Sequence, residues 1–276
     1  MSRLLSANFS RLGKNKLFLF ALALMAALSV FTMVQYVLEA DKAEAYGYSI
    51  YFDECYFIMA PFIGLFITVV AIFFLSTDYG DGTIRNKITA GHTRAEIYSA
   101  NLITCVFISA LFDVVWLVFG LVGLPFMECS QGIGQMLLYA LVTLLFNISA
   151  AAIVTLVGML ISNKAISVTV SILLFFGLLM VLSYIIIALD EPEMYGYMEM
   201  TADGMQMVGP VENPQYISGA LRVVFECIAN TLPYGQAIML SNMALEHIVF
   251  NIAASVFLMV IVSAIGIIAF NKKDIK

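Results

Sequence analysis

Long apolar stretches alternate with short polar connections along most of the chain. Six stretches reach the roughly 20 residues that a helix needs to cross the hydrocarbon core of a bilayer. They cover residues 17–38, 56–76, 101–124, 136–161, 165–189 and 248–270. Their apolar residues run continuously rather than in alternation, which excludes the strands of a membrane β-barrel. The pattern predicts an all-α integral membrane protein with six spanning helices, because a helix satisfies its own backbone hydrogen bonds.

Two other segments show the pattern of helices that do not span. Leu4, Leu5, Phe9 and Leu12 recur at helical spacing, which predicts an amphipathic N-terminal helix lying on the membrane surface. The long segment before the sixth stretch begins with residues 190–215, which are expected to be irregular.

Residues 218–242 then show apolar residues at helical spacing, interrupted at Pro233. This predicts a helix–break–helix hairpin that dips into the membrane. Two amphipathic helices resting on the surface are the alternative. The connection at residues 162–164 is so short that spans four and five are expected to be adjacent and antiparallel.

The polar connection at residues 76–101 is longer and more patterned than an ordinary turn. Residues 83–90 can form two turns of helix, and Gly91 suits the end of that helix. Thr93 and Glu96 match a capping box, so a new helix begins there and continues into span three. The connection therefore predicts a short surface helix joined at both ends to membrane helices.

Composition and charge agree with a membrane protein and orient it. Hydrophobic residues make up 62%, charged residues 12%, and the mean hydropathy is +0.97, whereas soluble domains carry about 25% charged residues. Eleven of the 13 basic residues fall on the side that holds both termini, which predicts cytoplasmic termini. Fourteen of the 19 acidic residues fall on the other side. That outer face is either simply solvated or attracts cationic ligands. We expect a single domain over residues 1–276.

The sequence offers no recognisable catalytic or metal chemistry. It has no phosphate-binding loop of the G-x-x-x-x-G-K-[ST] type and no G-x-S-x-G element. His92 and His247 lack partners at metal-ligand spacing. We therefore expect no catalytic, cofactor-binding or metal-binding residues. Cys55, Cys129 and Cys227 fall on the outer side, where one disulfide or none is compatible with the spacing.

Asp113 is an ionisable residue near the middle of span three, and Asn147 lies near the middle of span four. The two side chains could meet at the same depth. Charged residues there are costly and mark functional sites by default. Asp113 either fixes helix packing through a hydrogen bond or forms a polar point in a transport path.

The small residues of the spans and the methionines of the chain give weaker indications of helix pairing and of a substrate surface. Ala23 and Ala27 in span one, and the small residues within 150–158 in span four, could form faces for pairing with another helix. The 16 methionines are interpreted as general membrane packing rather than as a substrate surface.

Two stretches within the polar connection resemble a known family. They are D-Y-G-D-G-T-I-R-N-K-I at residues 78–88 and G-H-T-R-A-E-I-Y at residues 91–98. With the six-span topology, the amphipathic N-terminus and the hairpin before span six, the chain resembles the type-2 ABC transporter permeases over its whole length. The acidic residue is often Glu in that family but is Asp78 here, and Asn101 stands where a basic residue is common. These departures concern contacts at the partner surface.

The resemblance implies the membrane half of an exporter in the bacterial plasma membrane. Two permease chains, identical or related, would pair with two separate ATPase subunits that hold ATP and magnesium, so this chain would be no enzyme itself. Residues 83–90 would form the cytoplasmic coupling helix. The residues implied in coupling to the ATPase are Asp78, Gly82, Thr83, Ile84, Arg85, Lys87, Ile88 and Arg94.

The substrate is less defined. Small permeases encoded apart from their ATPase often export peptides or protect against antimicrobial peptides. The acidic outer face and the outer hairpin suit an amphipathic, cationic peptide. Membrane lipid is the other expected partner, and no binding of nucleic acid is expected. Export of a lipid, drug or ion, a secondary transporter or channel, and a sensor or scaffold stay open.

Overall fold

A computed structural model describes residues 1–80, 82–201 and 204–274 of the chain. Within these ranges, six helices are long and apolar enough to cross a membrane, and each coincides with one predicted stretch. They are α2 (Lys16–Ala45), α4 (Ala60–Gly80), α6 (Arg94–Gly120), α7 (Gly132–Leu160), α8 (Lys164–Asp190) and α11 (Ile248–Lys272). The predicted all-α membrane fold is therefore confirmed.

Shorter elements connect these helices. They are α1 (Ser2–Gly13), α3 (Phe52–Tyr56), α5 (Thr83–Thr89), the 3-10 helix η1 (Leu121–Phe126), β1 (Met194–Thr201), β2 (Gly204–Glu212), α9 (Gly219–Thr231) and α10 (Pro233–Ser241). The N-terminal amphipathic helix is present, and it packs on α6 through the rings of Phe9 and Phe107, whose centroids are 5.0 Å apart.

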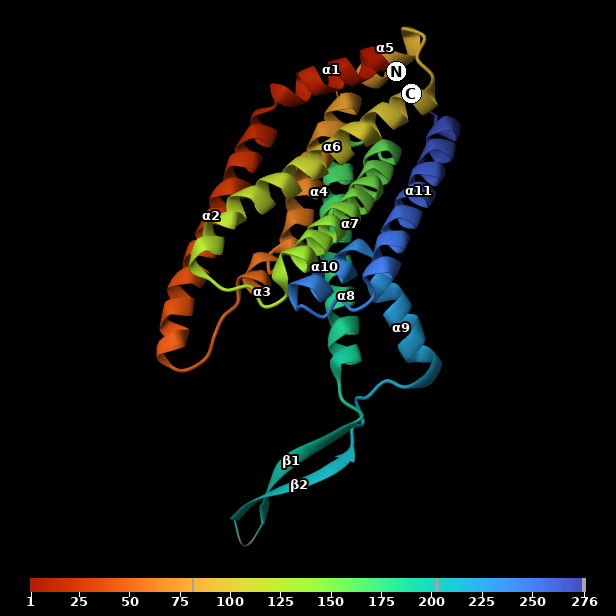
Figure 1. The fold of residues 1–276 in the computed structure, drawn as a ribbon. Helices are drawn as coiled ribbons and strands as arrows, with labels where there is room; N and C mark the ends of the chain where they lie inside the picture. Colours follow the sequence, from red (N-terminus) through yellow and green to blue (C-terminus); the bar gives the residue numbers. More distant parts are fainter. Residues whose placement is uncertain (81, 202–203, 275–276) are drawn as a thin grey trace.

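Both ends of the chain lie at one end of the bundle, together with α1 and α5 (Figure 1). We call this the terminal end. The strands β1 and β2 project from the opposite end, which we call the hairpin end (Figure 1). The even number of crossings that the sequence predicts therefore agrees with the structure.

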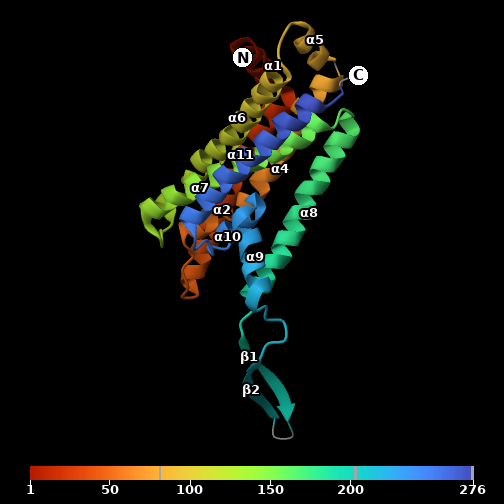
Figure 2. The same ribbon diagram turned by 90° about the vertical axis from the view of Figure 1, so that its right-hand side faces the viewer.

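The centre of the bundle is formed by α4 and α7. In their apolar stretches 61% and 56% of the residues are buried, against 17% in α8 and 22% in α11. The last two helices thus present most of their surface outward. α7 and α8 meet at their short connection and run antiparallel, as expected, but α8 then diverges from α7 and packs along α4 (Figure 2).

The prediction of irregular structure for residues 190–215 was wrong. β1 and β2 pair there as an antiparallel hairpin, with Met200 opposite Met205 and Tyr195 opposite Val211. The sequence does alternate in this region, with Tyr195 and Tyr197 two residues apart. The signal was missed because methionine and glutamate are not typical strand formers.

The helix–break–helix prediction before the sixth span is confirmed by α9 and α10. α10 lies inside the bundle, because Tyr234 is buried against Phe175 with ring centroids 4.9 Å apart. Gln236 is also buried and donates to the carbonyl of Asn230 at 2.7 Å, while Ser255 of α11 donates to Gln236. These contacts favour the inserted hairpin over two helices resting on a surface.

Candidate functional site

The short helix α5 has one inward face and one outward face. Gly82 and Gly91 flank it with φ of +64° and +89°, a backbone region that glycine adopts without the strain of a side chain. Ile84 is buried in the core of the bundle, and Ile88 packs against the same cluster. Arg85, Asn86 and Thr89 are exposed. The structure thus gives α5 a polar surface that faces away from the membrane helices.

The helix that follows α5 begins as the sequence predicts. The Thr93 hydroxyl accepts from the backbone N–H of Glu96 at 3.2 Å, and the Glu96 carboxylate accepts from the backbone N–H of Thr93 at 3.0 Å. This capping box fixes the start of α6. The connection between α5 and α6 is therefore a defined turn.

Asp78, at the end of α4, is fully buried and carries two ion pairs. Arg11 of α1 donates to Asp78 Oδ1, and Lys87 of α5 lies 2.9 Å from Asp78 Oδ2. Asn101 of α6 donates to the same Oδ2 at 3.3 Å. The Arg11 guanidinium also lies 3.9 Å from the centroid of the Phe74 ring, which shields it on one side. One carboxylate therefore joins α1, α4, α5 and α6.

Asn8 extends this junction along α1. Its amide donates to Asn101 Oδ1 at 2.8 Å and to Thr104 Oγ1 at 3.2 Å. Its own Oδ1 accepts from Lys87 Nζ at 3.4 Å. Asn8 is buried with Leu4 and Leu12 on the face of α1 that packs against α6. We call Asn8, Arg11, Asp78, Lys87 and Asn101 the Asp78 junction.

A second junction closes the terminal end. The guanidinium of Arg94 donates to the carbonyl oxygens of Asn271, at 3.0 Å, and Lys273. Lys273 Nζ donates to Tyr79 Oη at 2.7 Å and to the Met159 carbonyl at 3.1 Å. Burial lowers the pKa of Lys273 from 10.5 to about 8. The C-terminal end of α11 is thereby attached to α4, α6 and α7.

The structure separates the predicted coupling residues into two groups. Arg85 faces outward, and Gly82 and Thr83 begin α5 at partly exposed positions. Ile84 and Ile88 pack inward.

Three of the predicted coupling residues make contacts within the chain instead. The resemblance implied a surface role for Asp78, Lys87 and Arg94, but the structure places the first two in the Asp78 junction and the third against the C-terminal end. Asp78 has no exposed surface with which to meet a partner, because it is enclosed by its ion pairs. Asn101 is likewise buried, so its departure from the family pattern concerns an internal contact.

Sequence reasoning did not single out Asn8, Arg11, Tyr79 or Lys273. Asn8 left a signal, since it is a polar residue within the apolar stripe that Leu4 and Leu12 form. Arg11, Tyr79 and Lys273 left none, because basic residues and tyrosines are ordinary near the ends of membrane helices.

Asp113 and Asn147 do meet between α6 and α7. Asn147 donates to Asp113 Oδ1 at 2.7 Å, and both residues are buried. Asp113 Oδ2 has no hydrogen-bond partner within the described residues. All four cysteines are free thiols, so the outer disulfide that the spacing allowed is absent.

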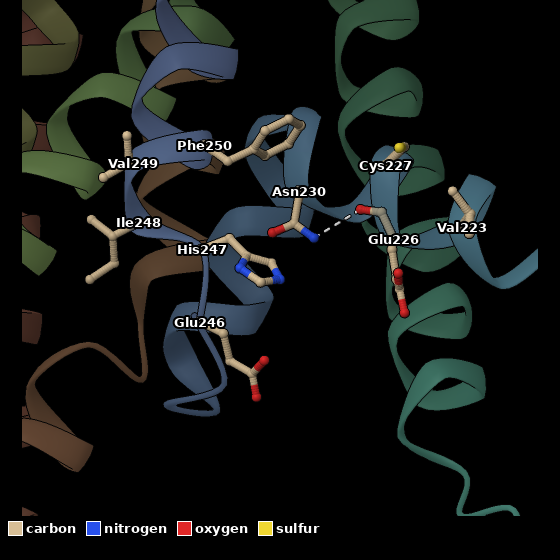
Figure 3. A pocket seen from close by; sticks show the side chains of 9 residues that line it. All are labelled: Val223, Glu226, Cys227, Asn230, Glu246, His247, Ile248, Val249 and Phe250. Carbon is tan, nitrogen blue, oxygen red and sulfur yellow. Dashed lines mark hydrogen bonds between the residues drawn. The ribbon is translucent and has the colours of Figure 1, made fainter.

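A groove of about 600 Å³ lies at the hairpin end, between α9 and the start of α11. Glu226, Cys227 and Asn230 line it from α9, and Glu246 and His247 line it from the opposite side (Figure 3). The carboxylate side chains of Glu226 and Glu246 extend toward the same open space (Figure 3). The groove combines apolar walls with two carboxylates, of which Glu226 also pairs with Arg222 at 3.1 Å.

A profile of the peptide export permease protein YydJ family matches residues 5–206. The chain belongs to this family. The match extends from α1 into β2, so it includes α5 and the Asp78 junction, while α9, α10 and α11 lie beyond it. No curated protein matches the chain.

Membership in the YydJ family confirms the resemblance to ABC-type exporter permeases. Together with the six apolar helices, it identifies a permease for peptide export, a multi-pass protein of the bacterial plasma membrane. A chain of this family is a transport subunit.

Proposed function

We propose that the chain is the permease subunit of an ATP-driven exporter and receives the motion of a separate ATPase through α5. The observation that carries the proposal is the two-faced character of this helix. Arg85, Asn86 and Thr89 are exposed for a partner, while Ile84 and Lys87 attach the opposite face to the bundle. The terminal end is proposed to be cytoplasmic, because it gathers most basic residues.

The Asp78 junction supports a mechanism of transmission. A push on α5 moves Lys87, and separating Lys87 from the buried Asp78 would break one of the two ion pairs of that carboxylate in a poorly solvated site. Leaving a buried charge wholly unpaired costs about 3–5 kcal/mol, and the cost here is a part of that because Arg11 stays on Asp78. Movement of α5 together with α1, α4 and α6 avoids this cost. The motion of the ATPase would thus reach three elements of the bundle at once.

The assembly proposed is two permease chains, identical or related, with two ATPase subunits. ATP and magnesium would bind in the ATPase, and this chain would supply no catalytic residue. The exposed faces of α8 and α11 leave room for a second permease, for lipid or for both.

The substrate proposed is an amphipathic peptide with positive charge. The family is described as exporting peptides. The groove at the hairpin end offers apolar walls and the carboxylates of Glu226 and Glu246, which would attract a cationic peptide on its exit side. Bacteriocin export and immunity against antimicrobial peptides both fit this chemistry.

Reconstitution with the cognate ATPase tests the proposal. Arg85→Asp should abolish the stimulation of ATP hydrolysis by the permease, since it reverses the charge on the exposed face of α5. Arg85→Lys should retain it. Lys14→Asp is the matched control, because Lys14 is also exposed at the terminal end but lies outside α5. Unchanged assembly and ATP hydrolysis in Arg85→Asp would reject α5 as the coupling element.

A further inference from the structure

The β-hairpin carries a pattern of methionines that the proposed transport function does not explain. Met198, Met200, Met205 and Met207 form two M-x-M pairs in the sequence, separated by four residues. The strand register places Met198 opposite Met207 and Met200 opposite Met205. Because successive residues of a strand face opposite sides, these four positions share one face of the hairpin. We call this face the methionine face.

The spacing of the four positions is small enough for one ligand. Directly opposed residues have Cβ atoms about 5 Å apart, and residues i and i+2 are about 7 Å apart along a strand. Methionine has three rotatable bonds after Cα, so sulfurs from such positions can converge. Met200 and Met205 are 81% and 71% exposed, so these two thioethers are not used in a core.

The surroundings favour a soft cation over other ligands. Thioether sulfur selects Cu(I) among biological metal ions, whereas carboxylates suit hard ions. Residues 165–226 contain no histidine or cysteine, and residues 165–221 contain no lysine or arginine but six acidic residues. The segment that carries the face therefore has a net negative charge. Within the described residues, no group of three or more His, Cys, Asp and Glu could hold a metal ion.

We propose that the methionine face binds one soft monovalent cation of the Cu(I) type through the thioethers of Met200 and Met205, with Met198 and Met207 at the adjoining register positions. The expectation of no metal site rested on histidine and cysteine spacing, which does not address thioether ligands. The interpretation of methionine as packing holds for Met25 and Met33, which are buried in α2, and does not extend to the hairpin.

Binding would have a structural consequence. A two-stranded hairpin is marginally stable by itself in water, and this one projects from the bundle (Figure 2). A cation held by sulfurs from both strands would tie β1 to β2, because metal binding to a site formed on folding stabilises the folded form. The proposal requires no transport and stands apart from the proposed function.

Titration of the full-length protein in detergent with Ag(I), a redox-stable analogue of Cu(I), tests the site. Cys129→Ser and Cys227→Ser remove the accessible thiols beforehand, since Cys55 and Cys105 are buried. One ion per chain is expected. The double variant Met200→Leu/Met205→Leu should weaken binding by at least about tenfold, because even outer-shell changes at metal sites cost that much. Met180→Leu, at a 73% exposed position of α8, is the control and should bind as the parent does.

Hydrogen exchange supplies a second measurement on the same samples. Ag(I) should slow exchange of the amides of β1 and β2 in the parent but not in the double variant. The proposal would be overturned if the parent and the double variant bound Ag(I) with equal affinity. It would also be overturned if Met180→Leu lost as much affinity as the double variant, or if Ag(I) did not slow exchange in the hairpin. If the double variant impairs peptide transport while it binds Ag(I) normally, the face is a peptide surface and the metal assignment is wrong.

Discussion

Asp78 is the residue on which the terminal end depends most. It is buried at the end of α4, and its carboxylate pairs with both Arg11 from α1 and Lys87 from α5. Without it, two cations would remain side by side with no carboxylate between them, and Asn8 Oδ1 would be left as the acceptor for Lys87. The residue that the family pattern suggested as a surface contact is therefore better understood as a positioning residue.

Asp78→Asn should lower the free energy of unfolding by about 3 kcal/mol or more, because it removes the negative charge between two cations. Thermal unfolding of the purified protein in detergent measures this as a lower Tm. Asp190→Asn is the control, since Asp190 is exposed at the end of α8. Equal Tm values for the two variants would show that the ion pairs contribute nothing to the fold.

Asp113 is predicted to serve packing through its hydrogen bond with Asn147. Asp113→Asn retains a hydrogen-bonding side chain of the same shape, so transport should stay near the parent rate. Asp113→Leu should cost about 1–3 kcal/mol of stability, because Asn147 is left buried without its partner. A large loss of transport in Asp113→Asn, with normal assembly, would assign Asp113 to the transport path instead.

Lys273 gives the terminal end a pH dependence. Its pKa is about 8 in the folded protein and 10.5 ordinarily, so the unfolded chain binds the proton more tightly. Stability should therefore rise as the pH increases from about 8 to 10.5, and this contribution is absent below pH 8. Lys273→Met should remove that part of the rise in Tm, whereas Lys272→Met, at an exposed neighbour, should keep it. An identical pH profile for both variants would contradict the assigned burial.

At the scale of elements, local patterns were sufficient wherever one segment determines its own structure. The six spans follow from length and hydropathy, and α5 and the start of α6 follow from Gly91 and the Thr93–Glu96 capping box. The Asp78 junction could not be predicted, because it joins Arg11 and Asp78 across 67 residues of sequence. The packing of α8 along α4 likewise depends on tertiary contacts that a short connection does not determine.

The two small-residue faces that the sequence suggested for helix pairing differ in their burial. Ala150, Ala151 and Ala152 are buried inside the protomer, and Gly158 packs against Leu75, so the face in α7 serves internal packing. Ala23 and Ala27 of α2 are exposed and stay a prediction for pairing with a second chain.

The groove between α9 and α11 yields a prediction on substrate charge. Glu226→Gln together with Glu246→Gln should reduce export of a cationic peptide and affect a neutral peptide less, because the negative charge of the groove is removed. The exposed ion pair between Glu226 and Arg222 is lost in the same variant, and that loss should affect both peptides equally. Export into or out of vesicles, compared for the two peptides, measures this. Glu44→Gln together with Glu54→Gln, at exposed positions of α2 and α3, is the charge-matched control. Equal losses of export for both peptides would show that the groove does not select its substrate by charge.

At the scale of the whole molecule, a central pair of helices is surrounded by helices that expose more of their surface. α4 carries Asp78 at one end and contacts α8 and α10 along its length, so it connects the terminal end with the hairpin end. α8 and α11 are the least buried spans. A displacement that begins at α5 can therefore reach α10 through α4.

Site-specific photocrosslinking in the assembled complex tests the central claim most directly. A photoreactive amino acid at Asn86, on the exposed face of α5, should crosslink to the ATPase subunit. The same amino acid at Val223, which is 58% exposed on α9 at the hairpin end, should not. Crosslinks to the ATPase from position 223, or none from position 86 in a complex that hydrolyses ATP and exports peptide, would contradict both the coupling role of α5 and the proposed orientation.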